Sequence, residues 1–265
     1  MSYCSDFWNV LAQLHAEIED TNFDLASARR LLPEIKSPVL VVGAGQGLIV
    51  GDLRKHGFEC DGVDLSPEMI RQAKLRRGIS LVQADAKAMP FPVASYQTII
   101  YATGVVDFTA EDDEIRAIFA EGRRVVKESG KILVAFYKTS AVQAEFLELV
   151  RLIRDHRAAF RESLEINLLN PVQLVAWVAR RAGIGRFRAA IALLRVAARS
   201  TRQERRNAFK MQRVFRKLAD PRSLINAAPE TVAYRNEGEI KNLFQRLGIP
   251  IKQFSAFASC WVVRI

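Results

Sequence analysis

Three glycines follow the first strongly apolar run of the chain, at a spacing that suits ligand binding. The run PVLVV leads into the turn GAGQG, in which Gly43, Gly45 and Gly47 alternate with other residues. A glycine turn lets the backbone approach a ligand, and the N–H groups of a following helix point toward that ligand. Alone the turn is a weak signal, because a dinucleotide fingerprint needs GxGxxG and Leu48 stands where its third glycine would be.

Two carboxylates follow at the ends of later apolar runs. Asp64 ends the run FECDGVD, and Asp85 ends the run ISLVQAD. A carboxylate after the second strand of a sheet can accept hydrogen bonds from ribose hydroxyls. A carboxylate after the third strand can hold the exocyclic amine of an adenine. Each residue taken singly is also explained as a turn or cap. Their order at one sheet edge favours a binding site.

Alternating strands and helices must position these groups. The pattern predicts a strand ending at the glycine turn, further strands over 58–64, 79–85, 96–102 and 131–137, and helices over 48–57, from Ser66-Pro67 and over 110–127. One more helix, NEGEIKNLFQRLGI, precedes two final strands that are nearly back to back. Such alternation is typical of a doubly wound, mostly parallel α/β sheet, here of seven strands. The last connection is too short for a parallel crossover, so the last strand should be antiparallel.

Four segments carry a resemblance to a known family. VLVVGAGQG, VDLSPEMIRQAK, ADAKAMPFPVASYQTII and EGRRVVKESGKILVAFY resemble the class I S-adenosylmethionine-dependent methyltransferases, especially the subgroup with the quinone-biosynthesis enzymes. The resemblance covers 38–138 and, more loosely, 236–265. It implies a Rossmann-like methyltransferase fold, with S-adenosylmethionine as cofactor and S-adenosylhomocysteine as product. The family usually has Pro-Gly-Gly before the fifth strand. This chain has Glu-Ser-Gly at 128–130, which we expect to be a turn.

The resemblance also implies cofactor-binding residues along one sheet edge. They are Gly43, Ala44, Gly45, Gly47, Asp64, Leu65, Asp85, Ala86 and Tyr101. In this assignment the glycines admit the methionine part of the cofactor. Asp64 holds the ribose with Leu65 against the adenine, and Asp85 binds the adenine amine beside the Ala86 backbone. Tyr101 would lie near the methionine end.

Catalytic residues are harder to assign, because methyl transfer from a sulfonium depends on alignment and exclusion of water, and a general base is optional. Tyr137, ending the fifth strand, could orient a substrate, or be an aromatic at the edge of the core. Asp107, after the fourth strand, could act as a base, or cap a loop. His15, on an N-terminal helix that could fold over the cofactor, could equally be a surface histidine.

Composition limits the class of protein. The 265 residues are 49% apolar and 26% charged, as in globular proteins. The three cysteines, at positions 4, 60 and 260, form no CxxC pair, so we expect reduced thiols and no metal site. The N-terminal stretch has neither a basic region nor an apolar core of a signal peptide, and no apolar run is long enough to span a bilayer. We therefore expect a cytoplasmic protein.

Positive charge is concentrated in one segment. The range 139–235 has 19 lysines and arginines against 8 acidic residues, whereas the rest of the chain is nearly neutral. We expect three parts: an N-terminal helical lid over 1–35, a cofactor-binding core over 36–138 and 236–265, and a helical cationic cap inserted after the fifth strand, over the substrate side. At helical spacing, one stripe within 186–219 collects basic side chains: Arg188, Arg195, Arg199, Arg202, Arg206, Lys210, Arg213 and Lys217.

Three interpretations of this stripe stay open. It could be a solvated cap whose apolar face packs on the core. It could meet an anionic membrane or an apolar or acidic small-molecule acceptor. It could also bind the phosphates of RNA, although few aromatic residues stand between its basic ones. The sequence thus favours a methyltransferase for a small-molecule or lipid-like acceptor. The alternatives are an RNA methyltransferase and a non-catalytic S-adenosylmethionine-binding protein.

Overall fold

The chain forms two compact units, one of Met1–Lys138 with Ala227–Ile265 and one of Thr139–Asn226. The computed structural model describes residues 9, 12, 31–107, 109, 111–137, 185–188, 190, 191, 194, 235–257 and 260–265. In the second unit the described residues from 186 to 194 are helical, and the side chains of Phe187 and Leu194 are 78% and 67% exposed. Within these described ranges, no helix is both long and apolar enough to cross a membrane.

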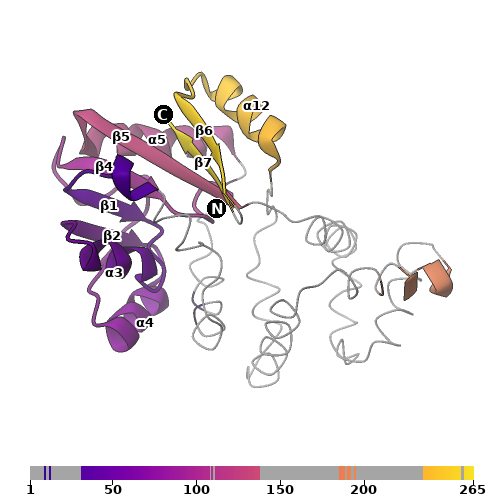
Figure 1. The fold of residues 1–265 in the computed structure, drawn as a ribbon, viewed down its shortest axis with the longest axis horizontal. Helices are drawn as coiled ribbons and strands as arrows, with labels where there is room; N and C mark the ends of the chain where they lie inside the picture. The colour runs from indigo at the N-terminus through magenta and orange to yellow at the C-terminus, as the bar shows by residue number, and fades with distance from the viewer. Residues whose placement is uncertain are drawn as a thin grey trace. The chain divides into compact units, whose positions relative to one another are not determined.

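A seven-stranded sheet organises the first unit, in the order β3-β2-β1-β4-β5-β7-β6 (Figure 1). The strands are β1 (Val39–Val42), β2 (Cys60–Asp64), β3 (Val82–Gln83), β4 (Tyr96–Tyr101), β5 (Val126–Tyr137), β6 (Gln253–Ala256) and β7 (Cys260–Arg264). β1 to β5 pair in parallel, whereas β7 pairs antiparallel with both β5 and β6. The predicted fold class, including the antiparallel last strand, is confirmed.

Helix ends follow the capping signals of the sequence. The helices are α3 (Leu48–Lys55), α4 (Pro67–Arg77), α5 (Asp112–Val125) and α12 (Glu237–Leu247), with a short 3-10 helix η1 at Leu32–Glu34. Ser66 caps α4 as predicted, because its Oγ accepts a hydrogen bond from the Met69 N–H at 3.1 Å. Asn236 and Glu239 form a reciprocal capping box at the start of α12.

Two apolar clusters sandwich the sheet. Successive residues of β1 and β5 alternate between them, so both faces of these strands are buried, as their apolar sequences require. One cluster joins the sheet to α5 and α12, through residues such as Phe119 and Phe244. The other joins it to α3, through residues such as Leu53. Both faces being covered, a ligand can approach the parallel strands only at their ends.

The junction between α5 and β5 differs from the prediction. α5 ends at Val125 and β5 begins at the next residue, earlier than expected. Val126 pairs with Tyr96, whereas Lys131 pairs with Thr98, so the chain between them bulges out of the ladder. The Glu-Ser-Gly triplet therefore lies inside a long irregular strand and is not a separate turn.

Candidate cofactor-binding site

A cleft opens where the parallel strands end. It encloses about 1140 Å³, part of it open to solvent, and is lined by segments following β1, β2, β3 and β4, by α5 and by the end of β5. Seven of the nine predicted cofactor-binding residues line it: Gly43, Ala44, Gly45, Asp64, Leu65, Asp85 and Ala86. Residues from three separate strand ends thus come together at one edge, as the sequence predicted.

The glycine turn shapes one wall of the cleft. Gly43 and Gly45 adopt φ values of 71° and 54°, a left-handed conformation that favours glycine. A Cβ atom on Gly45 would meet no atom within 4 Å, so the space it would enter belongs to the cleft. Gly47, contrary to the prediction, does not line the cleft. It caps α3 with φ 76°, and a Cβ there would lie 3.1 Å from Ile79.

Asp64 ties the end of β2 to the glycine turn. Its Oδ2 accepts a hydrogen bond from the Gly45 N–H at 2.7 Å, and its Oδ1 accepts one from the Ser66 N–H at 2.9 Å. Burial raises the pKa of this carboxyl, and the backbone N–H groups of Ser66, Gly45 and Leu65 oppose the rise. Each carboxylate oxygen can accept a second hydrogen bond. Asp64 can therefore hold a ribose while it fixes the turn, a second task that the spacing alone did not reveal.

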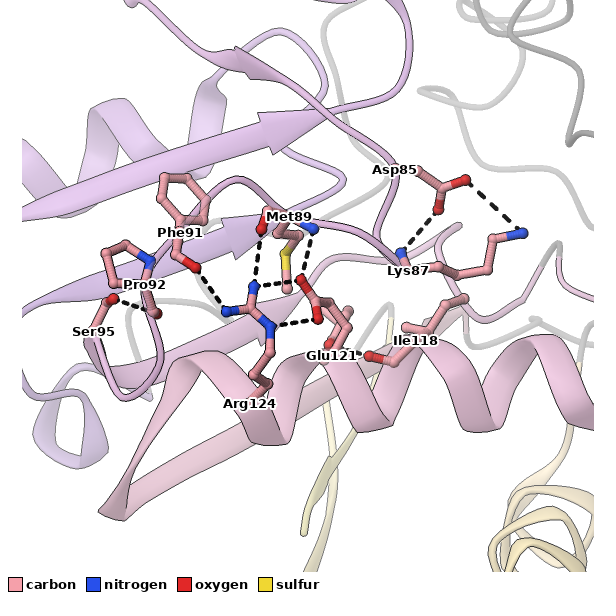
Figure 2. Close-up of polar contacts among 10 residues, drawn as sticks. Asp85, Lys87, Met89, Phe91, Pro92, Ser95, Ile118, Glu121 and Arg124 are labelled. Atoms are coloured by element: carbon pink, nitrogen blue, oxygen red, sulfur yellow. Dashed lines mark hydrogen bonds and ion pairs between the residues drawn. The ribbon is translucent and has the colours of Figure 1, made fainter.

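Asp85 belongs to a charged cluster at the cleft (Figure 2). Its Oδ1 accepts a hydrogen bond from the Lys87 N–H at 2.9 Å, and the Lys87 Nζ lies 3.8 Å from its Oδ2. The same Nζ donates to Glu114 Oε1 at 3.0 Å, and this hydrogen bond raises the pKa of Lys87. Sequence reasoning missed Lys87 and Glu114 as cleft residues. Glu114 lies in the acidic first turn of α5, where carboxylates also stabilise the positive end of the helix dipole.

Tyr101 does not line the cleft, contrary to the prediction. Its side chain is fully buried beneath α5, where its hydroxyl donates to the Ile118 carbonyl at 2.8 Å and its ring packs edge-on against Phe119. Side chains alternate between the two faces of a strand, and position 101 falls on the α5 face. The residues after it, from Ala102 to Val105, line the cleft instead.

Asp107 is likewise fully buried and does not line the cleft, so the structure does not support its interpretation as a base. Its Oδ2 accepts a hydrogen bond from the Gly104 N–H at 2.9 Å, and both oxygens lie 3.4 Å from the Tyr137 backbone N. Burial raises its pKa to about 7, against the lowering effects of the Gly104 hydrogen bond and of the Arg235 charge. Asp107 fixes the loop after β4 to the end of β5.

The other two catalytic candidates have different outcomes. Tyr137 lines the cleft at the end of β5 and is half-buried, so it remains a candidate for contact with a substrate. His15 lies outside the described residues, as does most of the basic stripe.

Two described residues of the N-terminal segment do reach the site's edge. Asn9 Oδ1 accepts hydrogen bonds from Ser66 Oγ at 2.7 Å and Glu68 N at 3.3 Å, and the Ala12 carbonyl accepts one from Gln46.

Known proteins resemble this chain over the same region. Residues 39–130 match the family described as "Methyltransferase domain". The demethylmenaquinone methyltransferase of Corynebacterium kroppenstedtii is 28% identical over 46% of this chain and 52% of its own length. The ubiquinone biosynthesis O-methyltransferase of Xanthomonas oryzae pv. oryzae is 26% identical over 62% of this chain and 69% of its own. The crystal structure of protein PH0226 from Pyrococcus horikoshii is 28% identical, with a TM-score of 0.39, over 44% of this chain and 61% of that one.

The chain thus spans about half the length of the first of these relatives. The range matched by the family, 39–130, contains the glycine turn and the carboxylates Asp64 and Asp85. The cofactor of this family is S-adenosylmethionine. The residues present suit that molecule, because the cleft has open space beside Gly45 and is lined by the carboxylates of Asp64 and Asp85. Residues 39–130 therefore resemble a methyltransferase domain, in the part of the chain that forms the cleft.

Proposed function

We propose that the protein is an S-adenosylmethionine-dependent methyltransferase that acts on a small-molecule or lipid-like acceptor. The convergence of Gly45, Asp64 and Asp85 in one cleft of a methyltransferase domain carries this proposal. In it, the two carboxylates bind the ribose hydroxyls and the adenine amine. The cofactor supplies an electrophilic methyl group on a sulfonium, and the chain's own contribution is to bind, align and exclude water.

The nature of the cleft wall supports an acceptor with apolar character. Beside the charged cluster, the lining includes aliphatic side chains on several sides, among them Leu48, Ile49, Met69, Val105 and Ile118. One relative described above is named a demethylmenaquinone methyltransferase and the other a ubiquinone biosynthesis O-methyltransferase, so both names refer to a quinone. Tyr137 is the cleft residue that we assign to acceptor orientation, because its ring stands at the end of β5, where the Asp107 carboxylate fixes its backbone.

Titration calorimetry with S-adenosylmethionine, S-adenosylhomocysteine and NAD tests the cofactor. We expect binding of the first two and none of NAD. Asp64→Ala should weaken binding by roughly 1–3 kcal/mol, the scale of hydrogen bonds to a charged group. Asp113→Ala is the matched control, because Asp113 is on α5, its side chain is 94% exposed, and it does not line the cleft.

Two outcomes would contradict the proposal. Binding of NAD with no binding of the sulfonium cofactor would exclude a methyltransferase. An unchanged affinity in the folded Asp64→Ala variant would mean that the ribose lies elsewhere. Once binding is established, incubation with labelled cofactor and candidate quinols or phenols, followed by mass spectrometry of the products, tests the acceptor class.

A further inference from the structure

The loop between β3 and β4 has little support from the sheet itself. β3 contains two residues and lies at the sheet edge, with both residues exposed. The following loop carries Asp85, the carboxylate assigned to the adenine amine. Within the loop, the Ala88 N–H donates to the Asp85 carbonyl at 3.0 Å and the Phe91 N–H donates to the Met89 carbonyl at 2.8 Å. These bonds are local to the loop, and the Lys87 Nζ hydrogen bond to Glu114 joins the loop to α5 close to Asp85.

Two further charged residues of α5 attach the loop at Met89 and Phe91 (Figure 2). Glu121 Oε1 accepts a hydrogen bond from the Met89 N–H at 2.7 Å. Arg124 donates to the Met89 carbonyl at 2.9 Å and to the Phe91 carbonyl at 2.8 Å. The backbone N–H and carbonyl of Met89 are thereby both bonded to side chains of one helix, which fixes this part of the loop to α5.

The two residues also hold each other. Arg124 Nε and Nη2 donate to the two oxygens of Glu121 at 2.7 and 2.6 Å, a two-pronged pairing that fixes both side chains. The hydrogen bond from Arg124 lowers the pKa of Glu121, so the pair stays charged at neutral pH. The Met89 side chain is 3% exposed and packs in the core cluster with Phe119, which adds an apolar anchor to the polar one.

From this arrangement we infer that Glu121 and Arg124 are positioning residues for adenine recognition. They hold the loop so that the Asp85 carboxylate meets the exocyclic amine of the cofactor. The inference rests on the proposed function and extends it to two residues that do not line the cleft. Any effect of these residues on base selectivity must therefore pass through the loop.

The test compares two ligands that differ at the base. In S-inosylhomocysteine a carbonyl oxygen replaces the adenine amine, and this oxygen would face the Asp85 carboxylate without a proton between them. The parent protein should bind S-adenosylhomocysteine at least about tenfold more tightly than the inosine analogue, because the analogue loses the hydrogen bond from the adenine amine to the charged Asp85 carboxylate. Arg124→Met should reduce this preference about fivefold or more, mainly by weakening the adenosine ligand.

Two further variants separate positioning from folding. Glu121→Gln keeps an oxygen for the Met89 N–H but loses the ion pair, so it should lower the preference less than Arg124→Met. Arg123→Met, one residue away on the exposed side of α5, should leave the preference unchanged. Thermal unfolding of each variant establishes that the measured protein is folded.

The possible results are distinguishable. A parent that binds neither ligand contradicts the proposed function and this inference with it. A parent that binds both ligands equally well shows that Asp85 does not read the amine, which overturns the inference alone. A selective parent whose folded Arg124→Met and Glu121→Gln variants keep the full preference also overturns it.

Discussion

Asp107 and Arg235 are ionisable side chains that interact electrostatically at the loop after β4. The Asp107 carboxylate is fully buried and binds the Gly104 N–H, while Arg235 donates to the carbonyls of Val106 and Thr109. Burial raises the pKa of Asp107 to about 7, far above the ordinary value near 4. Both side chains act on the loop after β4, which contributes Thr103, Gly104, Val105 and Thr109 to the cleft wall.

The buried carboxyl makes stability depend on pH. Between pH 4 and 7 the native state holds a proton on Asp107 that the unfolded chain has released, so stability should fall as pH rises. This group's contribution is present below about pH 4 and is lost as pH rises through about 7, by at most about 1.4 kcal/mol per pH unit. Asp107→Asn cannot ionise and should remove this slope.

Urea unfolding of the parent and of Asp107→Asn at several pH values from 4 to 8 measures the effect. The free energy of unfolding of the variant, minus that of the parent, should increase with pH. Parallel curves for the two proteins would mean that Asp107 ionises in the native state as freely as in the unfolded chain.

At the scale of elements, the start of α4 is a junction between the core and the N-terminal segment. The Asn9 side chain accepts hydrogen bonds from Ser66 Oγ and the Glu68 N–H, beside Leu65 in the cleft wall. We propose that residues 1–35 form a lid, held at this point. The N-terminus of α4 thereby has two side-chain acceptors for its N–H groups, Asn9 Oδ1 and the Oγ of its cap Ser66.

Removing this contact should loosen the lid. Asn9→Ala should speed dissociation of S-adenosylhomocysteine several-fold, while the free energy of unfolding falls by no more than about 1 kcal/mol. Asn9→Asp keeps the Oδ1 oxygen that accepts both hydrogen bonds and should behave as the parent. Stopped-flow displacement measures the rates. An unchanged dissociation rate in Asn9→Ala would contradict the proposed role of the lid.

The sequence revealed those parts of the site that depend on local pattern. Gly45, Asp64 and Asp85 each follow an apolar run, and parallel strands bring their carboxyl ends to one edge whatever the details of packing. Tyr101 was misplaced because the face on which a strand residue falls depends on register and on the helix that covers it. The attachment of the loop by Arg124 could not be foreseen either, since 33 residues separate Arg124 from the Phe91 carbonyl that it binds.

At the scale of the whole molecule, the basic segment presents exposed apolar side chains next to arginines. Phe187 and Leu194 stand seven residues apart on a helical stretch and are largely exposed, with exposed Arg186 and Arg188 beside Phe187. Apolar side chains flanked by arginines suit the interface of an anionic membrane. Most of the stripe within 186–219 lies outside the described residues, and its assignment to a cap or to a membrane contact stays a proposal.

Vesicle sedimentation tests the membrane contact. Binding should rise with the content of acidic lipid and fall with added salt, because each basic residue near such a surface contributes about 1 kcal/mol. Changing Arg199, Arg202 and Arg206 to Glu should abolish it and leave the affinity for S-adenosylhomocysteine unchanged. If the parent binds no vesicles at about 0.1 M salt, the membrane contact is excluded, and the remaining interpretations of the basic segment are a solvated cap and a substrate lid. Salt-sensitive binding of RNA, lost in the same variant, would favour the nucleic-acid alternative.

Both ends of the basic segment are secured at one place in the core. Before it, the Tyr137 N–H faces the Asp107 carboxylate, and after it Arg235 binds the carbonyls of Val106 and Thr109. The two ends of the segment are therefore held together like the ends of a closed loop. Doubling the length of such a loop raises the entropic cost of closing it by only about 0.6 kcal/mol. The segment is in this sense a replaceable module. We propose that exchanging the segment for another would leave the cleft and its proposed cofactor site unchanged.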